Sequence, residues 1–447
     1  MSSLVWLRRD VRLDDNPALV AATEQGPVCV LFVIDPALYE SCSQRRRELL
    51  VSGLHDLDRR LQGRGGRLRV ERGHPPVVVP VVAEELKVDE VHVNEEVTPY
   101  GRRRDEKVSR SCRLVPHDGI YVHPPGSVLT NEGRPYQVFT PFFRKWDSRD
   151  VKPYRLPDGA EFADDPGDGM PNRVGGAGQM GETAAEEHLA KFTERVESYL
   201  DDRDRIDRDS TSRLSVDLKY GWLGPRRVVA EIGRGTEARR AFLRQLAWRD
   251  FYGHVLAAHP TLADEAMDPR YREIAWRNDL SELDAWKQGQ TGVPLIDAAM
   301  RQLVSEGHMH NRARMVAASF LVKDLLVDWR IGERFFRHHL IDGDIAQNAG
   351  NWQWVAGTGT DSAPYFRIFN PVTQSKRFDP QGRYIRRWVP ELAEIPDALI
   401  HAPWESGPLE LLSYGVELGK DYPEPIVDHD MARVRAIDAY EAARGSR

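Results

Sequence analysis

The segment from Leu340 to Trp354 concentrates side chains that can bind a polar ligand. It carries Asp342 and Asp344, four side-chain amides between residues 347 and 353, and two tryptophans, around two glycines. Carboxylates accept hydrogen bonds from sugar hydroxyls, and an amide can pair with the edge of a heterocycle because it offers both a donor and an acceptor. A calcium loop requires a different spacing and a terminal glutamate. The segment therefore predicts either a site for a nucleotide-like ligand or a purely structural helix–turn–helix.

A second chemistry-bearing stretch, Thr211-Ser-Arg-Leu-Ser215, clusters hydroxyls and an arginine where a helix is expected to start. Backbone N–H groups at a helix start, together with hydroxyl donors, form a seat for phosphate. The same residues also make an ordinary helix N-cap. Both interpretations remain open from this stretch alone.

Aromatic and basic residues are frequent in the second half of the chain. The sequence contains 11 tryptophans, and basic runs occur at residues 226–249 and 376–387. Such residues can stack on bases and contact phosphates, although buried tryptophans and solvated helix faces are the alternatives. Polar residues also interrupt an apolar helical run between Met309 and Met315. No metal site is predicted, because His308, His310, His338 and His339 lack carboxylate or cysteine partners.

The elements that must position these residues differ between the two halves of the chain. Short β-branched runs at residues 4–7, 28–34, 68–71 and 90–94 alternate with stretches of helical spacing, such as residues 48–61. This alternation predicts an α/β, Rossmann-like domain with a parallel sheet and helices on both faces. Ligands bind beyond the carboxyl ends of such strands, so Arg8, Asp35 and Asn94 are candidate ligand neighbours.

A Pro-, Gly- and Asp-rich stretch near residues 150–181 predicts a linker. Its G-x-G-x-x-G sequence, Gly176 to Gly181, follows no strand, which argues against a dinucleotide-binding turn. Beyond Glu186 the periodicity is helical, for example at residues 295–303 and 315–326. We therefore predict an α/β domain at 1–128, a linker at 129–188 and a mostly helical domain at 189–447.

The composition excludes several classes of protein. The 447 residues are 41% hydrophobic and 29% charged, with a formal net charge of −7 and three cysteines, none in a C-x-x-C pair. This excludes a disulfide-stapled miniprotein and a disordered chain. Without a signal-peptide pattern or a membrane-length apolar run, we expect a cytoplasmic monomer that does not bind membranes.

With these motifs the chain resembles the DNA photolyase/cryptochrome family, and most of all its microbial class I cyclobutane pyrimidine dimer photolyases. The resemblance rests on motifs in order along almost the whole chain, at residues 6–16, 211–215, 246–252, 291–297, 309–315 and 342–371. It implies an antenna domain, a linker and a helical domain that holds FAD. It also implies light-driven repair of cyclobutane dimers by an electron from reduced FAD, with UV-damaged DNA as the partner.

The resemblance implies functional roles for three sets of residues in this sequence. The FAD set is Tyr199, Thr211, Ser212, Arg213, Leu214, Ser215, Arg249, Asn311, Arg314, Asp342, Gly343, Asp344 and Asn348. The DNA set is Arg203, Gln245, Trp248, Arg249, Asn311, Arg312, Met315, Trp354 and Gln374. The electron-transfer set is Asn348, expected beside the flavin N5, together with Trp352, Trp329 and Trp276, in order from the flavin to the surface.

Residues 96–105 resemble the members of the family whose antenna is 8-hydroxy-5-deazaflavin, with methenyltetrahydrofolate as the alternative. Arg9, Asp35 and Arg104 are its expected neighbours. A (6-4) photolyase, a cryptochrome photoreceptor and an unrelated flavin or nicotinamide oxidoreductase are the competing functions. Asn311 and Met315 stand where (6-4) enzymes carry histidines, which favours cyclobutane repair. Gln245 argues in the other direction, because dimer-repair enzymes usually carry a glutamate there.

Overall fold

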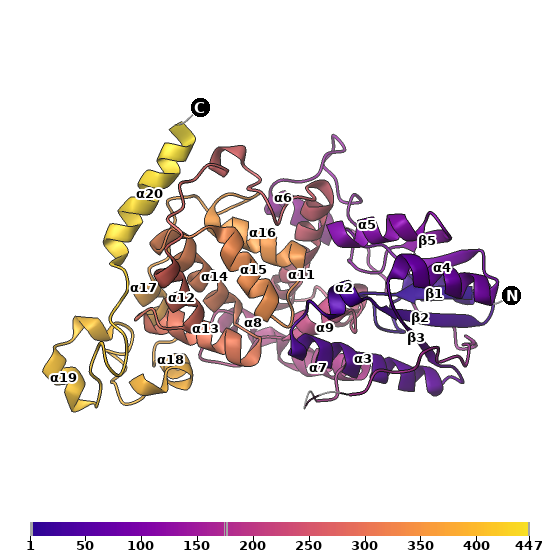
Figure 1. Ribbon diagram of the computed structural model, residues 1–447, viewed down its shortest axis with the longest axis horizontal. Helices are drawn as coiled ribbons and strands as arrows, with labels where there is room; N and C mark the ends of the chain where they lie inside the picture. Colours follow the sequence, from indigo (N-terminus) through magenta and orange to yellow (C-terminus); the bar gives the residue numbers. More distant parts are fainter. Residues whose placement is uncertain (1–2, 174, 176–177, 446–447) are drawn as a thin grey trace. The chain divides into compact units, whose positions relative to one another are not determined.

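The computed structural model describes residues 3–173, 175 and 178–445 (Figure 1). Gly176 and Ala177 lie outside the described residues, and with them part of the glycine-rich motif of the linker. The chain forms two compact units, Met1–Tyr199 with Ser212–Pro260 and Leu200–Thr211 with Thr261–Arg447. The first unit thus combines the α/β region with residues 212–260, which the sequence-based division places in the helical domain.

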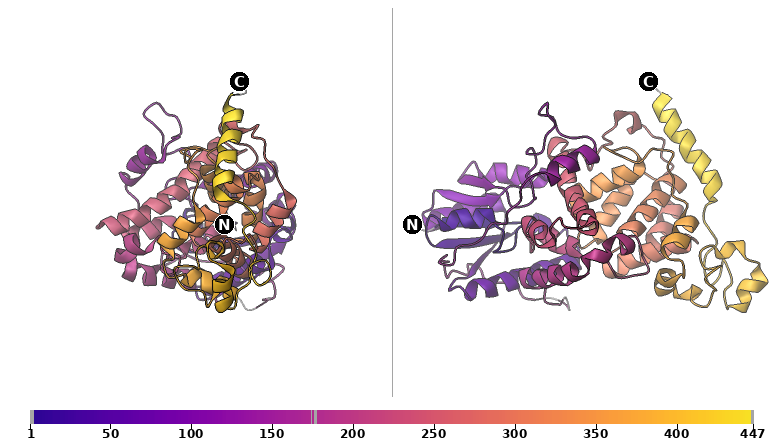
Figure 2. Two further views of the ribbon diagram at one scale, coloured as in Figure 1. Left: turned by 90° about the vertical axis from the view of Figure 1, so that its left-hand side faces the viewer. Right: turned by 180° about the vertical axis from the view of Figure 1, so that it is seen from behind.

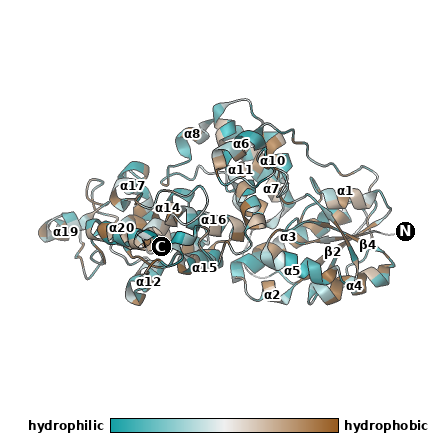
Figure 3. Ribbon diagram, turned by 90° about the horizontal axis from the view of Figure 1, so that it is seen from above, coloured by the Kyte–Doolittle hydropathy of each residue, from teal (hydrophilic) through white to brown (hydrophobic). Residues whose placement is uncertain are grey.

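The first unit is built on a parallel five-stranded sheet with the strand order β3-β2-β1-β4-β5. The strands are β1 Ser3–Leu7, β2 Val28–Ile34, β3 Leu68–Arg72, β4 Glu90–Asn94 and β5 Arg113–His117. The first four match the predicted runs. Strands β1 and β2 are buried along their whole length, as expected for strands covered on both faces, whereas β3 and β4 alternate apolar with polar side chains. In Figure 3 β2 is accordingly drawn as hydrophobic.

Helices cover both faces of this sheet. Leu4 and Trp6 of β1 pack in one core with the apolar side chains of α4 (Pro75–Leu86) and with Val108 of α5 (Pro99–Val108). Figure 3 shows α1 (Pro17–Thr23) and α3 (Gln44–Gln62) on the other side of the strands. The predicted α/β architecture is therefore confirmed. The remaining α-helices of this unit are α2 Pro36–Tyr39, α6 Phe139–Asp147, α7 Glu182–Arg195, α9 Leu214–Tyr220, α10 Pro225–Ile232 and α11 Glu237–Ala258, and a 3₁₀ turn spans Val196–Ser198.

Apart from an isolated bridge between Leu418 and Tyr422, the regular secondary structure of the second unit is helical in the described residues. Its α-helices are α12 Leu280–Gln288, α13 Pro294–Glu306, α14 Asn311–Ser319, α15 Trp329–His339, α16 Ile345–Ala356, α17 Pro371–Phe378, α18 Arg383–Trp388, α19 Pro408–Ser413 and α20 His429–Gly445, while the short α8, Tyr199–Asp202, starts at the junction of the units. A π-helical turn, Phe320–Asp324, follows α14, and 3₁₀ turns span Pro269–Tyr271, Pro390–Leu392 and Pro403–Glu405. The orange helices α14, α15 and α16 lie side by side in Figures 1 and 2 around a core that includes Trp329 and Trp352.

No helix among the described residues combines the length and the apolar character that crossing a membrane requires.

Candidate cofactor and nucleic-acid site

The polar segment at residues 340–354 forms the turn between α15 and α16 and the first turns of α16. Asp344 is the N-cap of α16, and its Oδ1 accepts hydrogen bonds from the backbone N–H groups of Ala346 (2.9 Å) and Gln347 (3.1 Å). A carboxylate here satisfies N–H groups that have no partner within the helix and also interacts favourably with the helix dipole. The predicted helix–turn–helix is confirmed, and Asp344 fixes where its second helix begins.

Asp342 joins this turn to α14 through an ion pair. Its Oδ2 lies 2.9 Å from Nη2 of Arg314, and the Asp342 side chain is almost fully buried. Nε of Arg314 also donates to the backbone carbonyl oxygen of Met309 at 2.8 Å. The planar guanidinium therefore has a fixed orientation, because two of its N–H groups have separate acceptors.

Asn348 lies one turn into α16 and is held from α15. Its Nδ2 donates to the backbone carbonyl oxygen of Glu333 (2.8 Å) and to Oε1 of the same residue (2.9 Å). The Glu333 side chain is fully buried, and burial raises its pKa, although Arg337 at 3.1 Å opposes this. Within the part of the chain that the structure describes, the side-chain oxygen of Asn348 accepts no hydrogen bond. Glu333 is thus a site residue that the sequence analysis missed.

The start of α14 carries the residues predicted to contact both FAD and DNA. His310 is its N-cap, with Nδ1 accepting from the backbone N–H of Arg312 at 3.1 Å. Arg312 pairs with Asp204 at 2.7 Å, and its guanidinium lies 4.5 Å from the ring centre of Phe378. Asn311 is exposed and its Nδ2 lies 3.6 Å from the sulfur of Met315. Burial lowers the pKa of His310 to about 4, so its imidazole is neutral near pH 7.

The other predicted DNA contacts of the second unit differ in burial. Trp354 on α16 is half-buried and packs against the main core. Gln374 on α17 has a buried side-chain oxygen with no hydrogen-bond partner in the described part of the structure. A buried acceptor without a partner is costly unless a ligand or water satisfies it. Arg203 follows α8 in the same unit.

The first unit contains the other predicted cofactor residues except Thr211, which belongs to the second unit. Helix α9 begins at Leu214, which confirms a helix start in the hydroxyl-rich stretch. The side-chain oxygen of Ser212 accepts from the N–H of Leu214 at 3.3 Å, and Arg213 adopts the left-handed conformation with φ of 55°. Tyr199 packs edge-on against Phe242 at 5.5 Å between ring centres.

Helix α11 presents Gln245, Trp248 and Arg249 within two turns. Trp248 stacks on Phe139, with ring centres 3.7 Å apart and planes 7° from parallel. Nη1 of Arg249 donates to the carbonyl oxygen of Ile120 at 2.8 Å, and the guanidinium lies 5.2 Å from the ring centre of Tyr121. All three side chains are partly accessible. The predicted set therefore divides between the two units.

The predicted tryptophan donors all belong to the helical unit. Trp329 and Trp352 are 2% exposed within its main core, and Trp276 is partly buried against that core. Ring contacts of the described residues connect Trp352 to Phe336 (4.9 Å) and Trp276 to Tyr440 (6.1 Å). No such contact joins two of the three tryptophans directly, so the electron-transfer chain remains a prediction.

Arg104, which is predicted to contact the antenna chromophore, belongs to an ionic cluster at the carboxyl ends of β1 and β4. Oε1 of Glu96 lies 2.9 Å from Nη2 of Arg104 and 3.7 Å from Nε of Arg8. Both guanidinium groups lie over the ring of Trp6, at 4.8 Å and 4.7 Å from its centre. Burial by itself would raise the pKa of Glu96, but the cations Arg104, Arg8 and Arg9 lower it to about 2.

Asp35, at the end of β2, completes this edge of the sheet. Its Oδ1 caps α2 by accepting from the N–H of Ala37 at 3.1 Å, and its Oδ2 accepts a hydrogen bond from the hydroxyl of Tyr100. Burial, followed by the neighbouring Asp35, raises the pKa of Tyr100 to about 12. The strand ends predicted Arg8, Asp35 and Asn94 as ligand neighbours, and the resemblance implied Arg9, Asp35 and Arg104. The structure places Arg8, Asp35 and Arg104 at this edge, and their contact with an antenna chromophore stays a prediction.

Comparisons with known proteins assign both halves of the chain to the same family. A family model for DNA photolyase matches residues 3–158, and a model for the FAD binding domain of DNA photolyase matches residues 242–442. The chain is 42% identical over 465 residues to a deoxyribodipyrimidine photo-lyase from Streptomyces griseus, covering 99% of both chains.

Two solved structures extend this similarity to the fold. A bacterial class III photolyase from Agrobacterium tumefaciens superposes with a TM-score of 0.92 at 35% identity, covering 100% of this chain and 98% of that one. A cryptochrome from Synechocystis superposes with a TM-score of 0.89 at 28% identity, covering 98% and 99% respectively. The chain described here belongs to the DNA photolyase family.

Proposed function

We propose that the protein repairs cyclobutane pyrimidine dimers in DNA by light-driven electron transfer from reduced FAD. The observation that carries this proposal is the orientation of Asn348. Its amide nitrogen is engaged by Glu333, so its oxygen remains as an acceptor for a ligand donor. A reduced flavin offers such a donor at N5–H. The full-length similarity to a protein named deoxyribodipyrimidine photo-lyase supports the same activity.

The residues present fit an FAD. In the second unit, the Arg314–Asp342 ion pair and the Asp344 cap provide an arginine and two acids beside Asn348. Carboxylates suit sugar hydroxyls, and a guanidinium offsets negative charge. In the first unit, we assign the hydroxyls of Ser212 and the neighbouring stretch to the pyrophosphate. When bound and reduced, FAD supplies the photoexcited electron that splits the cyclobutane ring.

The protein's own task is placement of the lesion. A dimer stacks poorly, so rotating it out of the duplex costs only a few kcal/mol. We assign Trp248 and Trp354 to stacking against the extruded bases, and Arg203 and Arg312 to the DNA backbone. The buried oxygen of Gln374, which lacks a partner in the described structure, suits a donor on a base.

Two side chains of α14, Asn311 and Met315, favour cyclobutane repair over (6-4) repair. Opening a (6-4) adduct requires proton transfer, and neither the Asn311 amide nor the Met315 thioether can serve as a general acid. Gln245 supports the alternative, since its amide lacks the carboxyl group usual in dimer repair. The cyclobutane ring needs no protein proton donor to split, so we retain it as the substrate.

For the antenna we propose 8-hydroxy-5-deazaflavin, with methenyltetrahydrofolate as the alternative. The support is the polar edge formed by Asp35, Tyr100 and Arg104 at the strand ends, where α/β sheets bind ligands. Co-expression with deazaflavin synthesis is expected to add a blue absorption band to the purified protein. Reconstitution by folate alone would overturn this choice.

The decisive experiment is a repair assay with the illuminated, reduced holoenzyme. Repair should restore the ultraviolet absorbance of intact thymines to irradiated oligothymidylate. Repair of a (6-4) substrate alone would assign the other lesion, and repair of neither would favour a cryptochrome-type photoreceptor. The purified protein should also carry FAD, and Asp344→Ala should lose it. A chain that cannot be reconstituted with FAD would contradict the whole proposal, including any flavin-based alternative.

A further inference from the structure

The first unit contains a pocket that includes none of the residues assigned above to FAD, DNA or the antenna. Its volume is about 550 Å³, and five separate segments of the chain line it: the β1–α1 loop, the end of α3, the linker, α7 and α10. Ligand pockets for small molecules usually enclose about 300–1,000 Å³. The pocket is therefore large enough for an organic ligand of nucleotide size.

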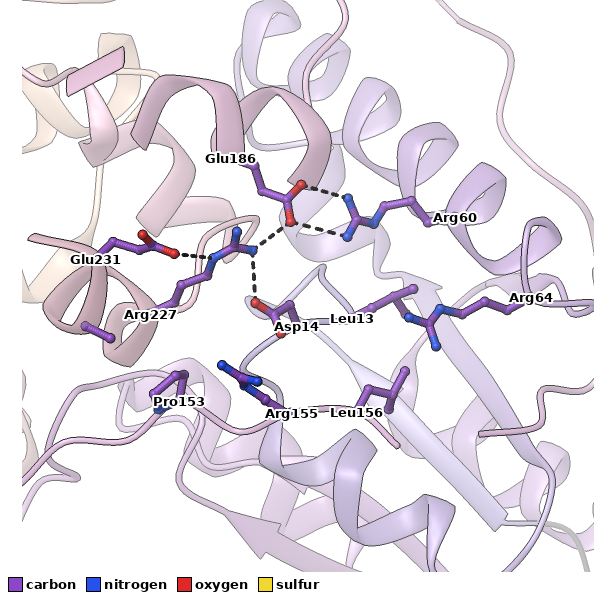
Figure 4. A pocket seen from close by; sticks show the side chains of 11 residues that line it. Leu13, Asp14, Arg60, Arg64, Pro153, Arg155, Leu156, Glu186, Arg227 and Glu231 are labelled. Atoms are coloured by element: carbon purple, nitrogen blue, oxygen red, sulfur yellow. Dashed lines mark hydrogen bonds and ion pairs between the residues drawn. The ribbon is translucent and has the colours of Figure 1, made fainter. Parts of the chain in front are cut away.

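The carboxylates on its wall are already paired (Figure 4). Nη1 of Arg227 lies 2.9 Å from Oδ2 of Asp14 and 2.7 Å from Oε1 of Glu186, and Nε of Arg227 lies 3.9 Å from Oε1 of Glu231. Glu186 also pairs with Arg60 at 3.3 Å. Each acid thus has a cationic neighbour within the wall, and none is left to attract a cationic ligand.

Two further arginines on the wall, Arg64 and Arg155, form no ion pair among the described residues. Their side chains also make no hydrogen bond with the described residues, and both are exposed to solvent. In Figure 4 the Arg155 guanidinium lies beside Asp14, and the Arg64 side chain extends toward Leu13 from the other side of the pocket. The pocket therefore offers two cationic groups without protein partners.

We propose that this pocket binds a small phosphate-bearing anion, with Arg64 and Arg155 as its charged contacts. Guanidinium groups match phosphate oxygens because two parallel N–H donors can contact two oxygens at once. The apolar side chains of Leu13, Leu156 and Pro153 give the organic part of such a ligand a surface to pack against.

A small ligand fits this geometry better than a DNA backbone. Nonspecific DNA contacts come from basic grooves or patches that follow the phosphates of the strand. Here the two available cations belong to a hollow whose wall also carries Asp14, Glu186 and Glu231. These carboxylates would repel successive phosphates of a strand, whereas a small ligand can place a phosphate group at an available arginine without passing along all three acids.

The test uses the full-length, FAD-loaded protein and inorganic pyrophosphate as the probe, titrated by calorimetry at fixed ionic strength. We expect saturable binding with one site per chain. Arg64→Ala and Arg155→Ala should each weaken it at least tenfold, while visible absorbance shows that FAD remains bound. Both side chains are exposed and make no hydrogen bond or ion pair with the described residues, so both variants should fold. Arg433→Ala, at an exposed position on α20 outside the pocket, is the matched control and should bind like the parent.

Absence of saturable pyrophosphate binding, or an equal loss in Arg433→Ala, would overturn the proposal. Affinity for a single-stranded oligothymidylate is measured in parallel. If Arg64→Ala and Arg155→Ala weaken DNA binding and leave pyrophosphate binding unchanged, the two arginines are DNA contacts and the small-ligand assignment is wrong. Unchanged DNA affinity combined with lost pyrophosphate binding would support it.

Discussion

Asn348 on α16 donates both of its observed side-chain hydrogen bonds to one residue of α15, Glu333, at 2.8 Å to the backbone carbonyl and 2.9 Å to the carboxyl group. Because both acceptors lie on the same residue, the amide nitrogen is directed toward α15. Arg337 holds the Glu333 carboxyl group at 3.1 Å. Glu333 therefore positions Asn348.

Replacing Glu333 tests this relationship. Glu333→Ala removes the side-chain acceptor and should lower the free energy of unfolding by about 1–3 kcal/mol, the usual cost of an unmet hydrogen bond in the interior. It should also shorten the lifetime of photoreduced flavin in air, because Asn348 can then rotate away from N5. Glu333→Gln keeps an acceptor oxygen and is the control. Equal flavin lifetimes in Glu333→Ala and the parent, followed by visible absorbance, would contradict a positioning role.

His310 should make the protein sensitive to acid. Burial lowers its pKa from 6.5 to about 4. Between these values the unfolded chain binds a proton that the folded chain does not, so this residue's contribution to stability is complete above pH 6.5 and falls as the pH drops toward 4. Asparagine is a good N-cap without a titrating ring. His310→Asn should therefore lose less stability than the parent between pH 6.5 and 4, by up to about 1.4 kcal/mol per pH unit, as measured by denaturant unfolding. Parallel pH profiles for the two proteins would refute this.

Much of the fold could be predicted from local sequence, and the exceptions have physical causes. Strands β1 to β4 were recognised because each contains valine or leucine side chains that the covered sheet buries. Strand β5, Arg113–His117, was missed because it is a half-exposed edge strand that contains Pro116. Edge strands tolerate a proline and carry weaker hydrophobic patterns.

The candidate site, like the fold, could be predicted only in part from local sequence. Asp342, Asp344 and Asn348 are recognisable because polar residues crowd into one short segment. Glu333 was missed because a glutamate on a helix with exposed arginines resembles a solvent-facing residue, and only packing of α16 against α15 buries it. The pocket that we propose to bind a phosphate-bearing anion could not be predicted from the sequence, because its lining residues come from five distant segments.

The Arg314–Asp342 pair should matter for FAD retention. Arg314→Lys keeps the charge but cannot reach both Met309 and Asp342 with a planar fork. Loss of one charge-assisted hydrogen bond is worth about 1.5–3 kcal/mol, so FAD should bind roughly 10- to 100-fold more weakly. Flavin fluorescence during dilution measures the release. Arg330→Lys, in a surface pair with Asp328 at 2.6 Å, is the matched control. Equal FAD release from the two variants would count against the assignment.

Trp276 is the predicted terminal electron donor. Its partly accessible ring can exchange electrons with a reductant in solution, whereas Trp329 and Trp352 are buried. Trp276→Phe should keep FAD bound and slow photoreduction at least severalfold, because phenylalanine is much harder to oxidise. Time-resolved visible absorbance under blue light measures this. Trp404→Phe, at another partly buried tryptophan of the same unit, should leave the rate unchanged. A rate in Trp276→Phe equal to that of the Trp404 variant would remove Trp276 from the chain.

Gln245 stands where the resemblance to dimer-repair enzymes implies a glutamate. Within the described part of the chain its side-chain amide makes one long contact, 3.5 Å from Nε2 to the carbonyl oxygen of Ala241, so it is not fixed in the core. Trp248 lies three residues later on the same face of α11. A glutamine can donate hydrogen bonds to thymine carbonyls, but it has no carboxyl proton to offer the negative charge that develops on the dimer.

Gln245→Glu should therefore raise the quantum yield of cyclobutane repair, with little change in FAD content or in folding, because the two side chains have nearly the same volume. Photon-counted repair of oligothymidylate dimers is the measurement. Gln245→Ala controls for loss of the hydrogen bond and should fall below the parent. The gain in Gln245→Glu should diminish as the pH rises and the carboxyl group ionises, since only its protonated form donates. A yield that falls in both variants would show that the native amide itself is the group the lesion requires, and would shift the assignment toward (6-4) repair.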